Sequence, residues 1–124
     1  MTGALILIVE DNDKNLKLAR DLLQHHGFRM LEADTAAAGI ALAEQHVPDL
    51  ILMDIQLPDM DGVTALGRLR ESAATTSIPV VALTAFAMAG DRERLLASGF
   101  DGYLAKPIDV RHFSDRVRQY CEPT

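Results

Sequence analysis

The stretch that most constrains this chain is Asp49–Asp54, which reads D-L-I-L-M-D. Its four bulky apolar residues follow one another without polar alternation, which is typical of a strand buried on both faces of a parallel sheet. Asp54 then stands where the strand leaves the sheet at its carboxyl edge, and open α/β sheets bind ligands at that edge. Asp is also a common turn residue, so this stretch alone leaves a turn and a binding site equally open for Asp54.

Short apolar runs alternate with helical patterns along the rest of the chain. The predicted strands are Leu5–Val9, Phe28–Ala33, Asp49–Met53, Ile78–Leu83 and Gly102–Ala105. Helices are predicted from a cap at Asp13 to Gly27, over Ala36–His46, from Val63 past Leu69, over Ala87–Ser98, and after a cap at Asp109, with Val110, Phe113, Val117 and Tyr120 on its apolar face. The alternation predicts one doubly wound α/β domain over residues 1–124, with five parallel strands and helices on both faces.

The composition excludes several classes of function. The net charge is -6 and the pI is near 5.0, and there is no basic stripe, so direct nucleic-acid binding is not expected. Cys121 is the only cysteine, which excludes an internal disulfide and is consistent with a reducing, cytoplasmic location. No apolar run approaches the ~20 residues that a membrane span needs, so no membrane association is expected.

Charged and hydroxyl side chains follow four of the five predicted strands. The first strand is followed by Glu10 and Asp11, the third by Asp54, the fourth by Thr84 and the fifth by Lys106. The carboxyl ends of parallel strands share one edge, so these groups should lie together. Two carboxylates about 4 Å apart repel by on the order of 4 kcal/mol at an effective dielectric of 20, so the site calls for a cation. Oxygen ligands of this kind suit Mg²⁺.

The same groups predict a site for a phosphoryl group. Asp54 has the position of a nucleophile, and carboxylates of this kind form aspartyl phosphates. Mg²⁺, Lys106, the Thr84 hydroxyl and backbone N–H groups would stabilise the charge on the transferring oxygens.

Four sequence blocks carry a resemblance to a known family. They are Glu10-Asp11, L-I-L-M-D-I-Q-L-P-D-M-D-G, A-L-T-A and A-K-P. Together they resemble the receiver domain of bacterial two-component response regulators, over about residues 5 to 120. The blocks V-E-D-N and T-A-F-A-M-A-G-D-R-E-R are more similar to single-domain regulators of the DivK type than to the chemotaxis CheY type. The resemblance implies a flavodoxin-like (CheY-like) fold with strand order 2-1-3-4-5, and a single receiver domain without an output domain is expected.

The resemblance also implies a phosphoacceptor and a metal site. Asp54 would take a phosphoryl group from a phosphohistidine on a sensor histidine kinase or a histidine phosphotransfer protein. Mg²⁺ would be held by Glu10, Asp11, Asp54 and the backbone carbonyl of Gln56. The phosphorylated protein would then regulate a downstream protein through the face formed by the fourth helix, the fifth strand and the fifth helix.

Further roles follow from the same resemblance. Thr84, Lys106 and the backbone N–H of Ala85 would contact the phosphoryl group, and the bond between Lys106 and Pro107 is expected to be cis. Thr84 and Tyr103 match the family's switch pair, in which the hydroxyl moves toward the phosphoryl group and the ring turns inward.

Two positions could tune the lifetime of the phosphoryl group. Gln56 lies two residues after Asp54, and Phe86 lies two residues after Thr84. A bulky Phe86 would hinder an attacking water and make autodephosphorylation slow. The alternative is that Phe86 packs away from the site.

Four other functions compete with this interpretation. A flavin-binding flavodoxin needs a hydroxyl- and glycine-rich phosphate loop after its first strand, where this chain has Glu10-Asp11-Asn12-Asp13. A phosphatase of the haloacid dehalogenase type needs a second Asp two residues after its nucleophile, where this chain has Gln56. The others are a pseudo-receiver that acts without phosphorylation and the receiver domain of a hybrid histidine kinase.

Overall fold

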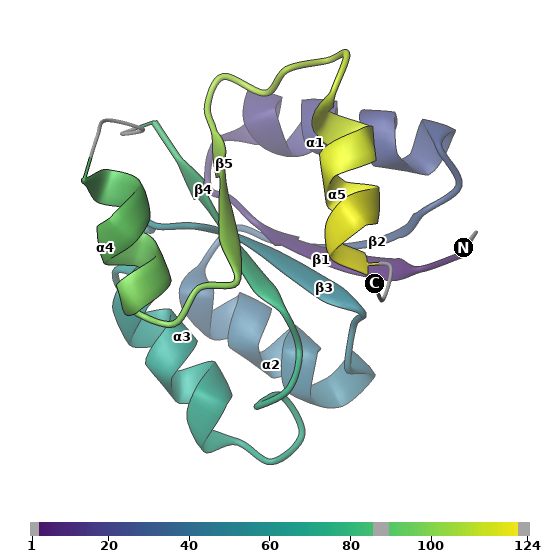
Figure 1. The fold of residues 1–124 in the computed structure, drawn as a ribbon. Helices are drawn as coiled ribbons and strands as arrows, with labels where there is room; N and C mark the ends of the chain where they lie inside the picture. The colour runs from purple at the N-terminus through teal and green to yellow at the C-terminus, as the bar shows by residue number, and fades with distance from the viewer. Residues whose placement is uncertain (1–2, 86–89, 122–124) are drawn as a thin grey trace.

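Five strands and five helices alternate along the chain in the computed structural model, which describes residues 3–85 and 90–121. In chain order they are β1 (Leu5–Val9), α1 (Asp13–His25), β2 (Arg29–Ala33), α2 (Ala36–His46), β3 (Leu50–Asp54), α3 (Gly62–Glu71), β4 (Val80–Thr84), α4 (Asp91–Ala97), β5 (Gly102–Ala105) and α5 (Phe113–Cys121). All strand pairs are parallel, and the order is β2-β1-β3-β4-β5 (Figure 1). The predicted fold class and strand order are therefore confirmed.

The burial of each strand follows its place in the sheet. All five residues of β3 and of β4 are buried, as their unbroken apolar runs predict for strands covered on both faces. The edge strand β2 is only partly buried, which agrees with its alternating sequence. The sequence pattern thus predicted which strands lie at the centre.

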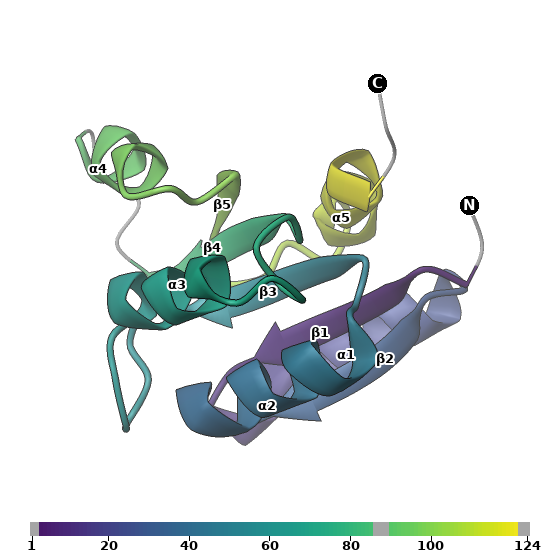
Figure 2. The same ribbon diagram turned by 90° about the horizontal axis from the view of Figure 1, so that it is seen from below.

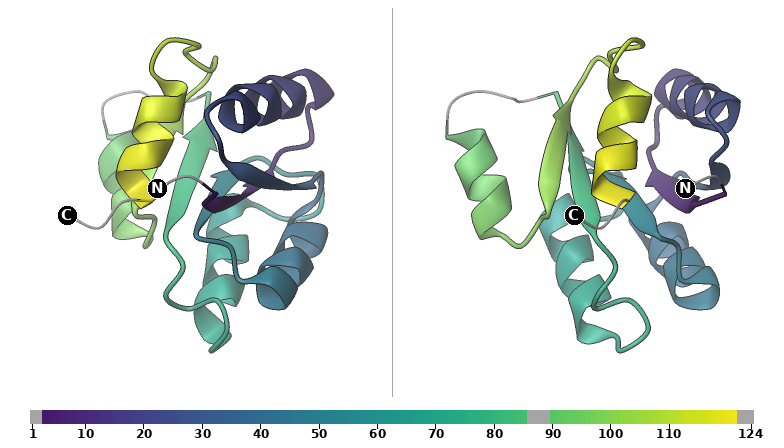
Figure 3. Two further views of the ribbon diagram at one scale, coloured as in Figure 1. Left: turned by 90° about the vertical axis from the view of Figure 1, so that its right-hand side faces the viewer. Right: turned by 45° about the vertical axis from the view of Figure 1, so that its right-hand side comes forward.

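Helices cover both faces of the sheet. One apolar cluster joins one face to α2, α3 and Leu95 of α4, and a second joins the other face to α1 and α5. Figure 2 shows these layers from below, and in both views of Figure 3 the sheet separates α2 and α3 from α1 and α5. Within the described ranges, no helix is long and apolar enough to cross a membrane.

The register of the sheet brings the strand ends to one level. Met53 pairs with Val9, so Asp54 and the residue after β1 leave neighbouring strands together. Across the next pairs, Asp54 lies beside Leu83 and Thr84 beside Ala105. The carboxyl ends of β1, β3, β4 and β5 therefore form one continuous edge.

The predicted cap of α1 is off by one residue. Asn12, not Asp13, is the N-cap: its backbone is extended, and its side chain accepts a hydrogen bond from Asn15 N. Both residue types favour this position, and Asn12 occupies it because Asp13 already has helical backbone geometry.

The start of α5 is also later than predicted. Asp109 Oδ1 accepts a hydrogen bond from Arg111 N in a turn, and the helix begins only at Phe113. Val110 lies in that turn and is 58% exposed, so its predicted place on the apolar face is wrong. Val63, in the first turn of α3, is likewise exposed, with 47% of its surface accessible.

Other strand boundaries differ from the predictions by one or two residues. The second strand begins at Arg29 rather than Phe28, and the third covers Leu50–Asp54 rather than Asp49–Met53. The fourth strand begins at Val80 rather than Ile78, because Pro79 has no N–H to donate to a neighbouring strand. Helix α4 runs from Asp91 to Ala97 with Gly90 as its N-cap, so it is shorter than the predicted range, of which residues 87–89 lie outside the described residues.

Candidate functional site

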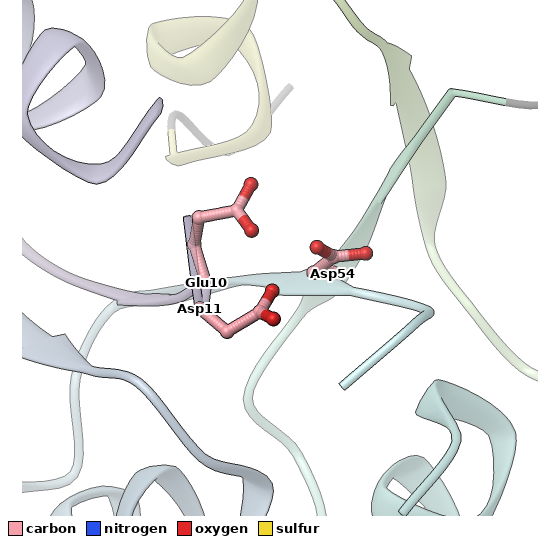
Figure 4. A group of neighbouring side chains, drawn as sticks. All are labelled: Glu10, Asp11 and Asp54. Carbon is pink, nitrogen blue, oxygen red and sulfur yellow. The ribbon is translucent and has the colours of Figure 1, made fainter. Parts of the chain in front are cut away.

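Three carboxylates converge at the carboxyl edge of the sheet. Glu10 and Asp11 follow β1, Asp54 ends β3, and one oxygen of each lies within 4.8 Å of the others (Figure 4). Glu10 is 1% exposed and Asp54 is 5% exposed, whereas Asp11 is open to solvent. The predicted acidic cluster therefore exists, and Asp11 lies at its accessible side.

Lys106 reaches this cluster from the end of β5. Its Nζ lies 2.6 Å from Glu10 Oε1 and 2.8 Å from Asp54 Oδ2. Its backbone N–H donates to Thr84 O at 2.7 Å, and the peptide bond to Pro107 is cis, as expected. One ammonium group stands against three carboxylates, which leaves negative charge in the site when all of them are ionised.

The pKa values reflect this crowding. Burial, a hydrogen bond with Asp54 and the repulsion between the two carboxylates raise the pKa of Glu10 from 4.5 to about 7, against the opposing effects of Lys106 and Asn12 N. Burial of the ammonium group lowers the pKa of Lys106, but its hydrogen bonds to Asp54 and Glu10 outweigh burial and hold that pKa above 10.5. The lysine is charged, and without a cation Glu10 takes up a proton near neutral pH.

The donor set fits a hard divalent cation. Glu10 Oε1 is buried, and its close partner is Lys106 Nζ at 2.6 Å, which Asp54 also shares. Three carboxylates facing one another around one ammonium group favour an ion that prefers oxygen ligands, such as Mg²⁺. The exposed position of Asp11 leaves that site open toward solvent.

The loop after β3 is folded back on itself beside the site. Gln56 N donates to Asp54 Oδ1 at 2.9 Å, Gln56 forms an antiparallel bridge with Asp61, and Gly62 N donates to Ile55 O at 3.0 Å. A Cβ at Gly62 would lie 2.7 Å from Ile55 Cα, so only glycine permits this closure. The loop thus holds one oxygen of Asp54 while Lys106 holds the other.

Of the remaining predicted residues, Thr84 and Ala85 lie at this edge, and Tyr103 lies within β5. Thr84 ends β4 and is 1% exposed, and Ala85 follows it at the surface. Tyr103 is half-buried on β5, with the Arg92 guanidinium 5.9 Å from its ring centre. Phe86 lies outside the described residues, so its proposed influence on hydrolysis stays a prediction.

One contact near the site has no counterpart among the predicted functions. Asp59, in the loop after β3, accepts hydrogen bonds from Ala36 N and Ala37 N at the start of α2, both at 2.9 Å. One feature of the sequence could have indicated this contact. The first turn of α2 is A-A-A, so it carries no acidic residue that could stabilise the positive end of the helix dipole.

The fold and this edge define a CheY-like α/β domain with an acidic, lysine-containing site. A family model described as the response regulator receiver domain matches residues 6–118. The chain belongs to this family, and it is the receiver domain of a two-component response regulator.

The relatives are consistent with the DivK type. The chain is 43% identical to the polar-differentiation response regulator DivK of Brucella ovis and to that of Brucella abortus, over 93% of this chain and 94% of each relative. Among solved structures, a putative response regulator from Chloroflexus aurantiacus is 26% identical, with a TM-score of 0.89 over 97% of this chain and 98% of that one.

A receiver domain of a sensor histidine kinase is also similar. The protein, from Pseudomonas aeruginosa, is 34% identical to this chain, with a TM-score of 0.87 over 97% of this chain and 98% of its own, and has a magnesium ion coordinated in its active site cleft. As a response regulator receiver, the present chain is a signalling switch between an upstream phosphodonor and a downstream partner.

Proposed function

We propose that this receiver accepts a phosphoryl group on Asp54 from a phosphohistidine of a sensor histidine kinase or histidine phosphotransfer protein. The observation that carries the proposal is Lys106 Nζ, 2.8 Å from Asp54 Oδ2, beside three carboxylates within 4.8 Å. In the transfer, the bond between phosphorus and the donor imidazole breaks, and its electron pair stays on the imidazole. A bond forms between phosphorus and one oxygen of Asp54.

The proposed cofactor is Mg²⁺, held by the carboxylates of Glu10, Asp11 and Asp54 and by the backbone carbonyl of Gln56. When bound, the ion supplies positive charge next to the oxygens of the transferring phosphoryl group. The surplus of carboxylates over lysine and the burial of Glu10 and Asp54 support this assignment. The magnesium ion in the Pseudomonas relative supports it as well.

The other site residues would contact the phosphoryl group and change conformation in response to it. Lys106 would hold one of its oxygens, and the Thr84 hydroxyl and the Ala85 N–H, at the same edge, would contact others. Thr84 and Tyr103 would then switch together, and the resulting change on α4, β5 and α5 would be recognised by a downstream protein. Autodephosphorylation would be slow, tuned by Gln56 and Phe86.

Intact mass measurement after incubation with acetyl phosphate tests the proposal. The wild type should gain one phosphoryl group with Mg²⁺ and none with EDTA, and Asp54→Asn should gain none. A matched control is Asp49→Asn, which makes the same change just before the opposite end of β3 and should label like the wild type.

Two results would contradict the proposal. Labelling of Asp54→Asn would place the acceptor elsewhere. Failure of the wild type to label with both acetyl phosphate and a phosphorylated histidine phosphotransfer protein would instead indicate a pseudo-receiver. A hybrid kinase receiver, which the Pseudomonas relative makes the second candidate, would label in the same way as a single-domain regulator.

A further inference from the structure

The orientation of the Asp54 carboxylate depends on where the following loop lies. Gln56 N donates to Asp54 Oδ1 at 2.9 Å, so a displacement of Gln56 would turn the carboxylate or break this bond. The base of the loop is closed by the bridge between Gln56 and Asp61. Leu57 anchors the loop to the core, with 9% of its surface exposed.

The tip of the loop is tied to a different part of the chain. Asp59 Oδ1 accepts from Ala36 N and Oδ2 accepts from Ala37 N, across 23 and 22 residues of sequence. The next N–H of the helix, at Ala38, is capped by Thr35 Oγ1 at 3.1 Å. Asp59 therefore supplies the two caps, and the negative charge, that the first turn of α2 lacks.

The acceptor in this tie is charged, although Asp59 itself is exposed. Both acceptors belong to one ionised carboxylate, and hydrogen bonds to charged groups are about twice as strong as neutral ones. The bonds from Ala36 N and Ala37 N hold the pKa of Asp59 below 3.8, so the carboxylate is ionised at neutral pH.

We propose that Asp59 is a positioning residue of the phosphoacceptor site. By binding the first turn of α2 it fixes the loop that carries Gln56, and so holds Asp54 in the orientation that accepts the phosphoryl group. The inference rests on the proposed function of Asp54. It predicts that phosphorylation depends on a residue that has no contact with the reacting atoms.

Variants of Asp59 and of Thr35 separate positioning from helix stability. Asp59→Ala removes both bonds to α2 and releases the loop, whereas Thr35→Ala removes a cap of the same helix turn and leaves the loop tied. Asp59→Asn keeps one acceptor oxygen and serves as a milder variant should Asp59→Ala fold poorly. The measurements are the rate of labelling by acetyl phosphate at saturating Mg²⁺ and the backbone amide chemical shift of Gln56.

Asp59→Ala should label roughly tenfold more slowly than the wild type, because small misplacements of reacting groups have large effects on rate. The amide chemical shift of Gln56 should change in Asp59→Ala. Asp59→Asn should have a labelling rate and a Gln56 shift between those of the wild type and Asp59→Ala. Thr35→Ala should label within about twofold of the wild type, with Gln56 in place.

Labelling of Asp59→Ala at the wild-type rate would overturn the proposal, and so would equal slowing in Asp59→Ala and Thr35→Ala. If the wild type labels neither with acetyl phosphate nor with a phosphorylated histidine phosphotransfer protein, the proposed function of Asp54 fails, and the Gln56 amide decides the positioning role. A shift in Asp59→Ala alone would uphold that role, and its absence would refute it.

Discussion

Acidic residues at the amino ends of the strands and those at the carboxyl ends have different kinds of partners. At the amino edge each carboxylate is bound by backbone groups. Asp49 Oδ2 accepts from Leu5 N at 2.8 Å. Asp101 Oδ2 accepts from Val80 N at 2.8 Å and from the Arg70 guanidinium at 3.0 Å. These acidic residues fasten the strand starts to one another.

At the carboxyl edge the carboxylates face one another instead. Glu10 and Asp54 share the ammonium group of Lys106, and Asp11 adds a third carboxylate with an oxygen within 4.8 Å of theirs. Acidic residues next to strands are thus structural when backbone N–H groups satisfy them. They indicate a ligand site when burial and crowding leave them in need of positive charge.

Lys106 should be the charged residue whose loss costs the most stability. Lys106→Met leaves the buried carboxylates of Glu10 and Asp54 without their cation, and it should lower the free energy of unfolding by about 3 kcal/mol in EDTA. Urea denaturation near pH 8 measures the loss, with the exposed Lys17→Met as the control. Equal stability of the two variants would mean that the carboxylates at the carboxyl edge do not need the positive charge of Lys106.

Glu10 should make the metal-free protein less stable as the pH rises. Its pKa is about 7 in the folded protein and 4.5 is its usual value, so the folded state binds the proton more tightly, and ionisation between these values costs stability. Glu10→Gln should abolish this decline and be more stable than the wild type by on the order of 2 kcal/mol near pH 8. Urea denaturation in EDTA near pH 5 and pH 8 measures it. Glu44→Gln on α2, which is exposed, should keep the wild-type dependence.

Removing the charge of Asp101 should destabilise the protein, whereas removing that of Glu10 should stabilise it. Asp101→Ala leaves Val80 N without its acceptor and Arg70 without its partner, so it should lower the free energy of unfolding by about 1.5 kcal/mol at any Mg²⁺ concentration. Labelling by acetyl phosphate should be unchanged. Asp115→Ala, an exposed position on α5, is the control, and a loss of labelling in Asp101→Ala would break the comparison.

Replacing Asp49 should cause the smallest loss of stability among these variants. Its hydrogen bond to Leu5 N is exposed to solvent, so Asp49→Ala should lower the free energy of unfolding by about 0.5 kcal/mol. Denaturation of this variant beside Asp101→Ala gives the ranking within the amino edge. If Asp49→Ala lost more unfolding free energy than Asp101→Ala, burial would not control the strength of these contacts.

Most of the fold and the position of the site could be predicted from local sequence. The unbroken apolar runs of β3 and β4 identify central parallel strands, and parallel strands end at a common edge. That geometry alone brings Asp54, Thr84 and Lys106 to one place. The cap of α1 could not be chosen in the same way, because Asn12 and Asp13 are both good caps and backbone geometry decides between them.

The sequence by itself therefore determined the alternation of strands and helices, the central strands and the residues at the carboxyl edge, because periodicity and unbroken apolar runs are local properties. Only the tertiary structure decided how those residues interact. The bridge from Lys106 to both Glu10 and Asp54 depends on how β5 is placed relative to β1 and β3. The tie from Asp59 to Ala36 likewise joins two separate strand-helix units. Such contacts depend on the packing of distant segments, and no local pattern encodes them.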